Sequence, residues 1–477
     1  MTARESADLD EGVDAAEAGV RPGAPPRTTV ESDDGRTFVL RGAPADVQVG
    51  DLVEIRAQWG RLLGWVESRG RGSGGSTAAG ALLSTSSTPG PTAFGRIPAL
   101  VGPASSADAS AVMSGADSRL RLGTLVRRPD VAVGLVAQRM NRHTFWCGQS
   151  GSGKTYALGV ALERILAATR LPIVVLDPNS DFVSLGSPSP DASADEAREV
   201  AGRDVRVLRP DDSGSPLRVR FTDLSFRGKA ALLRLDPVRD RAEYNTLVRA
   251  AEDFDGREAS EVVPKLRMQG SPDAEALAQR IENLGIATWQ TTWAQGAVAA
   301  TDVIAERPAA TVLDLGGYDR LEEQLVVALA VLEDLWHRRA ERRPLLLVVD
   351  EAHNLCPPEP ETALGREVRD RLVQIAAEGR KYGLWLVVST QRPSKVHPGV
   401  VSQCDNLTLM RMNSRSDLAE LAELFGYVPE AMLQRASRFV QGEALLAGGF
   451  VPLPAIVRVR RRATLQGGVD VPVPLAD

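Results

Sequence analysis

The chain has 477 residues, a formal net charge of −6 and a hydrophobic content of 43%. This length predicts two or three domains, and the hydrophobic content is ordinary for a globular protein. The acidic total excludes a protein that coats nucleic acid over its whole surface, but it is compatible with a basic lining confined to one channel.

Three cysteines, Cys147, Cys356 and Cys404, show neither the C-x-x-C spacing of a zinc site nor a paired framework. We expect each to be a small buried hydrophobe in a reducing compartment. The amino terminus is acidic where a secretory signal is basic, and no apolar run approaches the roughly 20 residues that span a bilayer. The sequence predicts a cytoplasmic protein that does not enter a membrane.

The amino-terminal region predicts a disordered tail followed by a small β-domain. Residues 1–34 are rich in Asp, Glu, Ala and Pro and cannot bury enough surface to fold. Residues 35–128 alternate short apolar runs with Gly, Pro and Asp turn signals, which is the pattern of a small antiparallel barrel. A Gly/Ser/Thr-rich stretch at about 69–95 predicts a mobile loop within this region.

Residues 129–455 predict an α/β domain with a mainly parallel sheet. Apolar stretches such as "PIVVLD", "PLLLVVDEAH" and "LWLVVSTQ" alternate with helical patterns, and strands that are apolar throughout suit a sheet covered on both faces. Residues 224–293 have helical spacing without convincing strands, which predicts a helical insertion. A tail with four arginines follows at 456–477.

The stretch "GQSGSGKT" fills every fixed position of the phosphate-binding loop G-x-x-x-x-G-K-[ST], between an apolar run and a helical pattern. The backbone amides of such a loop point at phosphates, and Lys154 adds a charge for the β- and γ-phosphates. Thr155 is expected to give its hydroxyl to Mg²⁺. The sequence therefore predicts a site for ATP and Mg²⁺ made by Gly148, Gln149, Ser150, Gly151, Ser152, Gly153, Lys154 and Thr155.

A second apolar run ends in Asp350 and Glu351. A carboxylate at the tip of a core strand can hold Mg²⁺ through its water shell, and an adjacent one can activate the attacking water. We assign the first role to Asp350 and the second to Glu351. Two acids that cap the next helix are the alternative interpretation, and the nearby phosphate loop favours the catalytic one.

Two more polar residues are candidates for the reaction. Gln391 follows another apolar strand, a position from which its side chain can sense the γ-phosphate or the water. Arg380 ends the preceding helix, and arginine suits the stabilisation of a transferring phosphoryl group, often across a subunit boundary. From position alone, a solvated face is the favoured interpretation of Arg380.

Five motifs resemble one family in both content and order: "NRHTFWCGQSGSGKT", "LDPNSDF", "DEAHN", "EGRKYGLWLVVSTQRPSKV" and "VVSQCDNLTLMRM". They closely resemble the HerA branch of the HerA and FtsK class of ring-forming DNA-pumping ATPases. The resemblance extends from Leu122 to about Pro454 and implies a RecA-like P-loop core. The preceding β-rich region resembles the amino-terminal HAS barrel of that family.

The resemblance implies a homohexamer with ATP sites at the subunit interfaces and double-stranded DNA in the central channel. It also implies that Arg380 and Arg142 reach a nucleotide, at least one of them a neighbour's, and that Asp177 belongs to the nucleotide site. The family more usually has His-Gly where this chain has Asn179-Ser180. The tail at 456–477 is a candidate brace on the next subunit, with a solvated face as the alternative for its arginines.

The leading prediction is an ATP-hydrolysing motor that translocates double-stranded DNA, in DNA repair or phage defence. The four histidines lack metal-ligand spacing, so a separate NurA-like nuclease or another effector is the expected source of any DNA cleavage. An ATP-gated hexameric scaffold that does not pump DNA stays open as an alternative. A conjugation or secretion motor is a further alternative, although such motors usually need a membrane-attached segment.

Overall fold

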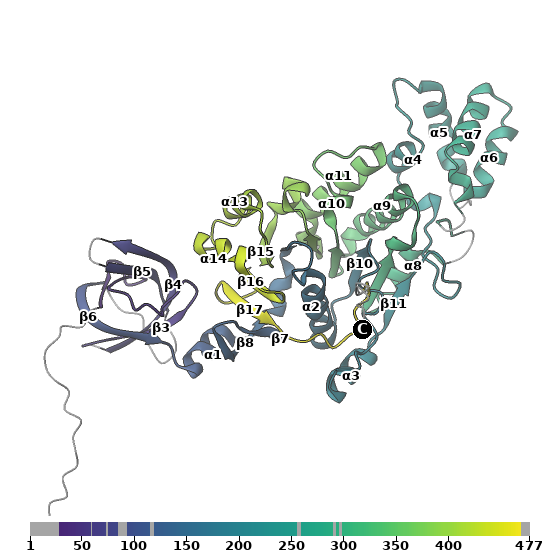
Figure 1. The fold of residues 1–477 in the computed structure, drawn as a ribbon. Helices are drawn as coiled ribbons and strands as arrows, with labels where there is room; N and C mark the ends of the chain where they lie inside the picture. Colours follow the sequence, from purple (N-terminus) through teal and green to yellow (C-terminus); the bar gives the residue numbers. More distant parts are fainter. Residues whose placement is uncertain are drawn as a thin grey trace, which may run out of the picture. The chain divides into compact units, whose positions relative to one another are not determined.

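The computed structural model describes residues 28–468 apart from 59, 73–74, 84–92, 115–118, 255–258, 290–291 and 295–297. These residues form two compact units, one comprising 28–48 and 53–103 and the other 49–52 and 104–468 (Figure 1). The disordered tail predicted at 1–34 lies outside the described residues up to 27, whereas Thr29–Ser32 already forms a strand. No helix within these ranges is both long and apolar enough to cross a bilayer.

The first unit is a closed β-barrel with the strand order β1-β2-β5-β4-β3-β6. Its strands are β1 (Thr29–Ser32), β2 (Thr37–Arg41), β3 (Leu52–Ala57), β4 (Gly60–Gly72), β5 (Gly75–Leu83) and β6 (Phe94–Pro103). Alternating side chains fill the interior, where Phe38, Leu40 and Ile55 are buried. Closure pairs every barrel strand on both sides and so leaves no long edge exposed.

Most of the loop predicted at about 69–95 is strand in the structure. Strands β4 and β5 form an antiparallel pair that runs from Leu63↔Leu83 to Gly72↔Gly75. Close packing requires glycine at position 80 of β5, because a Cβ there would lie 1.9 Å from the carbonyl oxygen of Trp65. A stretch rich in Gly, Ala and Ser resembles a loop in composition, but small residues also occur in strands where another backbone approaches closely.

The second unit contains an 11-stranded sheet with the order β11-β12-β10-β13-β14-β9-β15-β16-β17-β7-β8. Neighbours from β11 to β15 are parallel, and those from β15 to β8 are antiparallel. Its strands are β7 (Leu120–Leu125), β8 (Arg128–Leu135), β9 (His143–Cys147), β10 (Ile173–Asp177), β11 (Val205–Leu208), β12 (Ala310–Asp314), β13 (Leu345–Val349), β14 (Leu384–Thr390), β15 (Cys404–Leu409), β16 (Glu443–Gly448) and β17 (Ala455–Val459).

The predicted α/β fold with a mainly parallel core is confirmed, with one change in the boundary of the barrel. Every residue of β9, β10, β12 and β13 is buried, as the uninterrupted apolar runs predict. Strands β7 and β8 form a hairpin that extends the large sheet through β17, so the barrel ends at residue 103 rather than near 128. A hairpin pattern does not reveal which sheet the hairpin joins.

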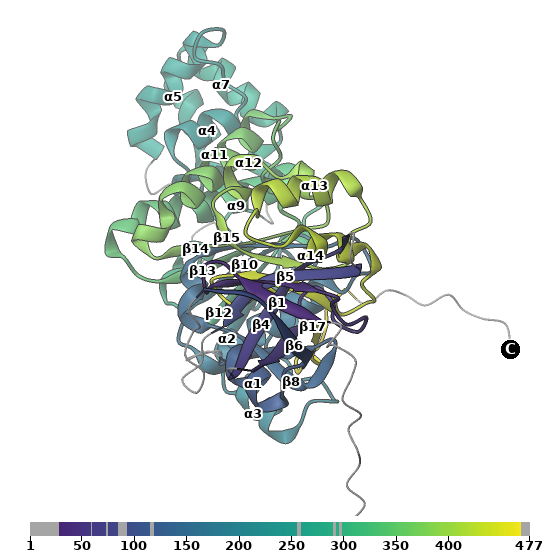
Figure 2. The ribbon, with the colours of Figure 1, turned by 90° about the vertical axis from the view of Figure 1, so that its left-hand side faces the viewer.

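Helices cover both faces of the parallel part (Figure 2). The helices are α1 (Ser106–Ser114), α2 (Lys154–Ala168), α3 (Ala194–Ala201), α4 (Phe226–Leu232), α5 (Arg241–Phe254), α6 (Ala259–Met268), α7 (Pro272–Asn283), α8 (Ala300–Ala305), α9 (Leu321–His337), α10 (Ala352–Leu355), α11 (Ala363–Glu378), α12 (Pro398–Val401), α13 (Arg415–Leu424) and α14 (Glu430–Gln434). The connections β9-α2-β10 and β12-α9-β13 cross the sheet in opposite directions. Right-handed crossovers therefore place α2 and α9 on opposite faces.

Helices α4 to α7 occupy the region where the sequence predicts a helical insertion. Helix α7 packs against α5 and α6, and α4 packs against α11 of the core (Figure 1). The buried residues Leu247, Leu266 and Leu277 supply the apolar interior of this group.

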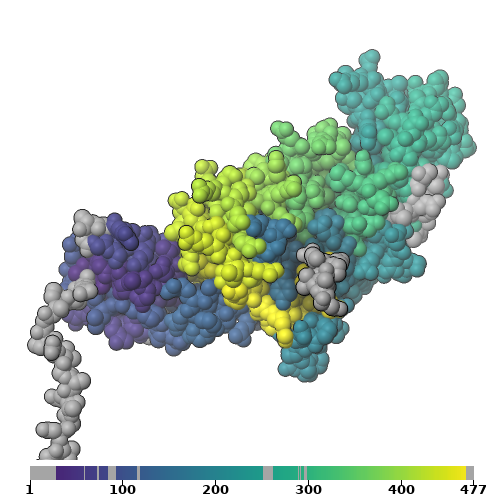
Figure 3. All heavy atoms as spheres, in the orientation of Figure 1, coloured from purple at the N-terminus to yellow at the C-terminus, as the bar shows by residue number. Residues whose placement is uncertain are grey.

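The carboxyl-terminal segment after β17 packs on its own chain. The amide of Arg462 donates to Tyr156 Oη at 2.7 Å, and those of Ala463 and Thr464 donate to Glu163 Oε2 at 2.8 and 3.0 Å. In Figure 3 the yellow carboxyl-terminal residues lie between the blue residues of α2 and the teal residues of α3. The brace predicted for 456–477 thus begins with a sheet strand and a segment bound to α2, and 469–477 lie outside the described residues.

Candidate nucleotide site

The phosphate-binding loop connects the carboxyl end of β9 to the amino end of α2. Gly151 and Gly153 have φ angles of 70° and 91°, in the left-handed region that glycine adopts without steric cost. A Cβ on Gly148 would lie 2.5 Å from Met410 Cβ, so the loop needs glycine there for space. The loop backbone is therefore set by its glycines, and it leads into the amino terminus of a 15-residue helix.

The segment that follows β15 supports the phosphate-binding loop from the side. The amide of Gln149 donates to the carbonyl of Arg411 at 2.9 Å, and Gln149 Oε1 accepts from the amide of Asn413 at 3.0 Å. Arg411 Nη2 donates to the carbonyl of Gly151 at 3.3 Å. Gln149 and Gly151 are thus held by a segment about 260 residues away in the chain. The sequence does not identify Arg411 as a residue of the nucleotide site, because it lies 260 residues from Gly151 in the chain.

Lys154 lies between the two predicted catalytic carboxylates. Its Nζ is 2.9 Å from Asp350 Oδ1, 3.1 Å from Glu351 Oε1 and 2.9 Å from Ser389 Oγ. Burial opposes the charge of Lys154, but the adjacent Asp350 and Glu351 outweigh it and raise the pKa of the ammonium above its usual value. The lysine therefore remains charged beside these acids. Ser389 is an additional contact that follows from the pairing of β13 with β14.

Glu351 is held in an unusual backbone conformation at the start of α10. Its φ of 43° lies in the left-handed region, which costs a non-glycine residue of order 1–3 kcal/mol and is concentrated at functional sites. Gln391 Nε2 donates to Glu351 Oε1 at 2.7 Å, and His353 Nδ1 lies 3.3 Å from Glu351 Oε2. The structure thus brings the predicted base and the predicted γ-phosphate sensor into direct contact.

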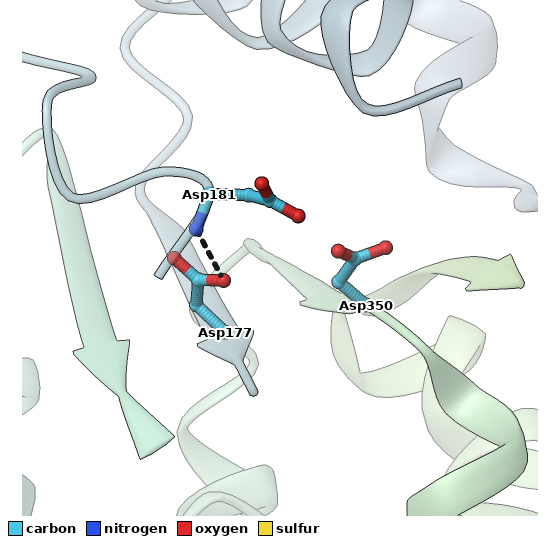
Figure 4. A group of neighbouring side chains, drawn as sticks. All are labelled: Asp177, Asp181 and Asp350. Atoms are coloured by element: carbon cyan, nitrogen blue, oxygen red, sulfur yellow. Dashed lines mark hydrogen bonds between the residues drawn. The ribbon is translucent and has the colours of Figure 1, made fainter. Parts of the chain in front are cut away.

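Three carboxylates meet at the carboxyl ends of β10 and β13 (Figure 4). Asp177 accepts the backbone amides of Asp181 and Phe182 at 3.0 and 2.7 Å, and so shapes the turn that carries Asp181 toward Asp350. One oxygen of each of the three acids lies within 4.8 Å of the others. Asp177 therefore positions the turn, and Asp181 is an acid that the sequence analysis missed.

This group of acids, Asp177, Asp181 and Asp350, fits a divalent cation. Asp350 is fully buried, and its Oδ2 has no hydrogen-bond partner in the described part of the chain. Burial raises the pKa of Asp177 to about 7 and that of Asp181 to about 6, and the charge of Asp350 adds to both effects. Carboxylate oxygens are the ligands that Mg²⁺ prefers. Thr155, in the first turn of α2, can supply the hydroxyl that the phosphate-loop motif predicts.

The departure from His-Gly at Asn179-Ser180 has a local structural consequence. Ser180 has a φ of 60°, a conformation that glycine adopts freely and serine rarely. Its Oγ donates to Asp314 Oδ1 at 2.7 Å, a hydrogen bond that offsets part of this strain and ties the turn to β12. The turn after β10 therefore keeps the shape that a glycine would allow.

Arg142 and Arg380 lie at the edge of the sheet opposite to the phosphate-binding loop. Arg142 immediately precedes β9 and Gly148 immediately follows it, so the strand separates them by about 20 Å. Arg380 similarly precedes β14, whereas Gln391 follows it. The structure does not bring these two arginines to the nucleotide site of their own chain.

The comparisons with known proteins agree with this architecture. Residues 120–335 match the family model described as "Helicase HerA, central domain". These residues therefore form a HerA-type ATPase domain. The predicted family and ATPase class are thereby confirmed.

Relatives of this chain include proteins named as DNA double-strand break repair helicase HerA. The chain is 24% identical over 405 residues to the one from Pyrococcus furiosus, and the match covers 73% of this chain and 70% of that protein. The chain is 31% identical over 127 residues to the one from Sulfurisphaera tokodaii, and that match covers 27% of this chain and 25% of that protein. The match to the second relative is thus confined to about a quarter of each chain.

Two solved structures share the fold of this chain. VirB4 of Thermoanaerobacter pseudethanolicus has a TM-score of 0.52 at 16% identity, over 72% of this chain and 96% of that one. The bacterial conjugative coupling protein TrwB has a TM-score of 0.53 at 13% identity, over 76% and 94%. The likeness shows that the three chains share a fold.

Proposed function

We propose that this HerA-type ATPase is a homohexameric motor that uses ATP hydrolysis to translocate double-stranded DNA. One observation carries the proposal of a ring: Arg142 and Arg380 precede strands β9 and β14, whereas the phosphate-binding loop follows β9 at its other end, about 20 Å from Arg142. An arginine at that edge is too far from the nucleotide of its own chain, so we infer that it acts on the nucleotide of another subunit. The names of the HerA relatives support DNA as the substrate.

Within each subunit, the residues at the carboxyl ends of the strands divide the chemistry. Lys154 and the loop amides bind the phosphates, and Glu351, oriented by Gln391, accepts the proton of the attacking water. Thr155, Asp350 and Asp181 would hold Mg²⁺, and Asp177 shapes the turn that carries Asp181. The ion, when bound, neutralises charge on the phosphates.

The proposal includes DNA in the central channel and a separate effector protein. Contacts of Lys and Arg with the phosphate backbone carry little sequence information, as a processive motor requires, and six copies of a few residues can make a basic ring in an acidic protein. The partner we propose is a NurA-like nuclease or another defence effector, on the basis of the family resemblance.

The test is steady-state ATPase activity with and without long duplex DNA, at several salt concentrations, on material shown by mass to be a ring. We expect duplex DNA to raise the rate, its effect to weaken steeply with salt, and sequence to matter little. Displacement of a triplex-forming strand reports directional movement, and Glu351→Gln serves as the inactive control. A ring whose ATPase ignores DNA and displaces no triplex, even with its partner protein present, would leave the ATP-gated scaffold as the explanation.

A further inference from the structure

Arg142 and Arg380 meet at a single carboxylate oxygen. Arg380 Nη1 lies 2.8 Å from Asp405 Oδ2, and Arg142 Nη1 lies 3.4 Å from the same atom. Asp405 lies 25 residues from Arg380 and 263 residues from Arg142 along the chain. The tertiary structure therefore brings Asp405 into contact with both arginines.

The order of the strands explains why these three residues are neighbours. Strand β9 lies between β14 and β15, and all three run parallel. Arg142 precedes β9, Arg380 precedes β14 and Asp405 is the second residue of β15. Adjacent strands are about 4.8 Å apart, so their amino ends place the three side chains within reach of one another.

The backbone beneath this cluster is held firmly. His143 Nδ1 accepts the amide of Leu386 at 2.9 Å, and its Nε2 lies 3.0 Å from the carbonyl of Ala376, so one buried ring joins β9 to β14 and to α11. Tyr427 Oη donates to the carbonyl of Asp405 at 2.9 Å. The three charged side chains project from this fixed base.

The charged groups themselves are half-exposed, with side-chain exposures of 37% for Arg142, 39% for Arg380 and 48% for Asp405. Ion pairs this exposed contribute little to folding stability. Two guanidinium groups near one point repel each other, however, and a shared carboxylate offsets that repulsion. The carboxylate therefore affects where the arginines point more than whether the chain folds.

We propose that Asp405 is a positioning residue, which holds Arg142 and Arg380 together as one unit presented to the triphosphate of a neighbouring subunit. The inference rests on the proposed function, because it requires the two arginines to act across a subunit boundary. Asp405 acts only through the arginines and does not touch the nucleotide. Its replacement should change turnover and leave nucleotide binding and assembly intact.

The test compares Asp405→Asn, which removes the charge and keeps the size, with the wild-type ring. We expect kcat for ATP with duplex DNA to fall about tenfold, with KM for ATP and the mass of the ring unchanged. Glu378→Gln is the matched control, because Glu378 lies two residues from Arg380 and pairs with Lys381 at 3.3 Å rather than with either arginine. This control should keep the wild-type kcat, and Asp405→Glu should recover part of the loss.

A second comparison asks whether Asp405 acts through the arginines. In a background that carries Arg142→Ala and Arg380→Ala, adding Asp405→Asn should change kcat less than twofold. A further loss as large as in the wild-type background would show an independent role and would overturn the inference.

The outcomes separate this inference from the proposed function. Arginine variants that lose activity, together with an Asp405→Asn ring at full or increased kcat, would overturn the positioning role alone. An Asp405→Asn chain that no longer forms the ring would show a structural role and would also overturn it. Arginine variants at the wild-type rate would refute the action of the arginines on a neighbour, and the inference with it.

Discussion

Gln391 Nε2 donates a hydrogen bond of 2.7 Å to Glu351 Oε1, and this contact joins the carboxyl ends of β14 and β13. The two strands are adjacent and parallel, so a residue that follows β14 naturally meets one that follows β13. The carboxylate of Glu351 is thus held in one orientation beside Lys154.

Replacement of Glu351 by Gln should abolish turnover and keep nucleotide binding. The amide retains the shape of the side chain but cannot accept the proton of the attacking water, and general base catalysis contributes roughly 10²–10⁴-fold. The measurement is steady-state ATPase together with a titration of nucleotide binding. Glu361→Gln, an exposed acid outside the nucleotide site, is the control. A Glu351→Gln ring that hydrolyses ATP at the wild-type rate would show that another group is the base.

Mixed rings should regain activity that neither parent has. Arg380→Ala subunits keep Glu351, and Glu351→Gln subunits keep Arg380, so some interfaces in a mixture carry both groups if the arginine acts on a neighbour. ATPase activity measured against the mixing ratio should therefore pass through a maximum. A rate that never exceeds either parent, in rings whose mixed composition is verified by mass, argues against action across the interface.

Asp181→Asn should raise the Mg²⁺ concentration needed for half-maximal ATPase activity. Asp181 lies with Asp177 and the partly unpaired Asp350, and a hard divalent cation binds more weakly when one carboxylate is lost. We expect a shift of about tenfold, with the rate recovered at saturating Mg²⁺. Asp191→Asn, an exposed acid near the carboxyl-terminal segment, is the control. An unchanged Mg²⁺ titration would remove Asp181 from the cation site.

His143 should make folding stability depend on pH in the acid range. Burial lowers its pKa from 6.5 to about 4 in the folded chain. Because the pKa of His143 is lower in the folded chain, the unfolded chain binds a proton more readily as the pH falls below 6.5. The free energy of unfolding therefore has its full value above pH 6.5 and decreases as the pH falls toward 4. One pKa unit corresponds to 1.36 kcal/mol, so the loss amounts to about 3 kcal/mol.

The measurement is the free energy of unfolding between pH 7 and pH 4 for the wild type and for His143→Gln. Glutamine can accept from Leu386 and donate to Ala376 as the neutral ring does, but it does not titrate. The difference between the two curves isolates the contribution of His143. Parallel curves would show that this residue is not the cause of any acid destabilisation.

The features of this protein that are contiguous in the chain could be predicted from its sequence. The loop from Gly148 to Thr155 is recognisable because all of its residues lie in one turn. The pair Asp350-Glu351 is recognisable because both residues lie at the end of one strand. The apolar strands predicted the parallel sheet for the same reason, since burial on both faces leaves an uninterrupted run.

Contacts between residues that are distant in the chain depend on the tertiary structure. Strand pairing brings Ser389 to Lys154, Asp181 to Asp350 and Asp405 to both arginines, and no local pattern encodes these contacts. The extended strand β9 separates Arg142 from Gly148, six positions away, because each residue of a strand adds about 3.3 Å. The stretch around Gly80, which the composition predicts to be a loop, forms a β-strand that packs closely against β4.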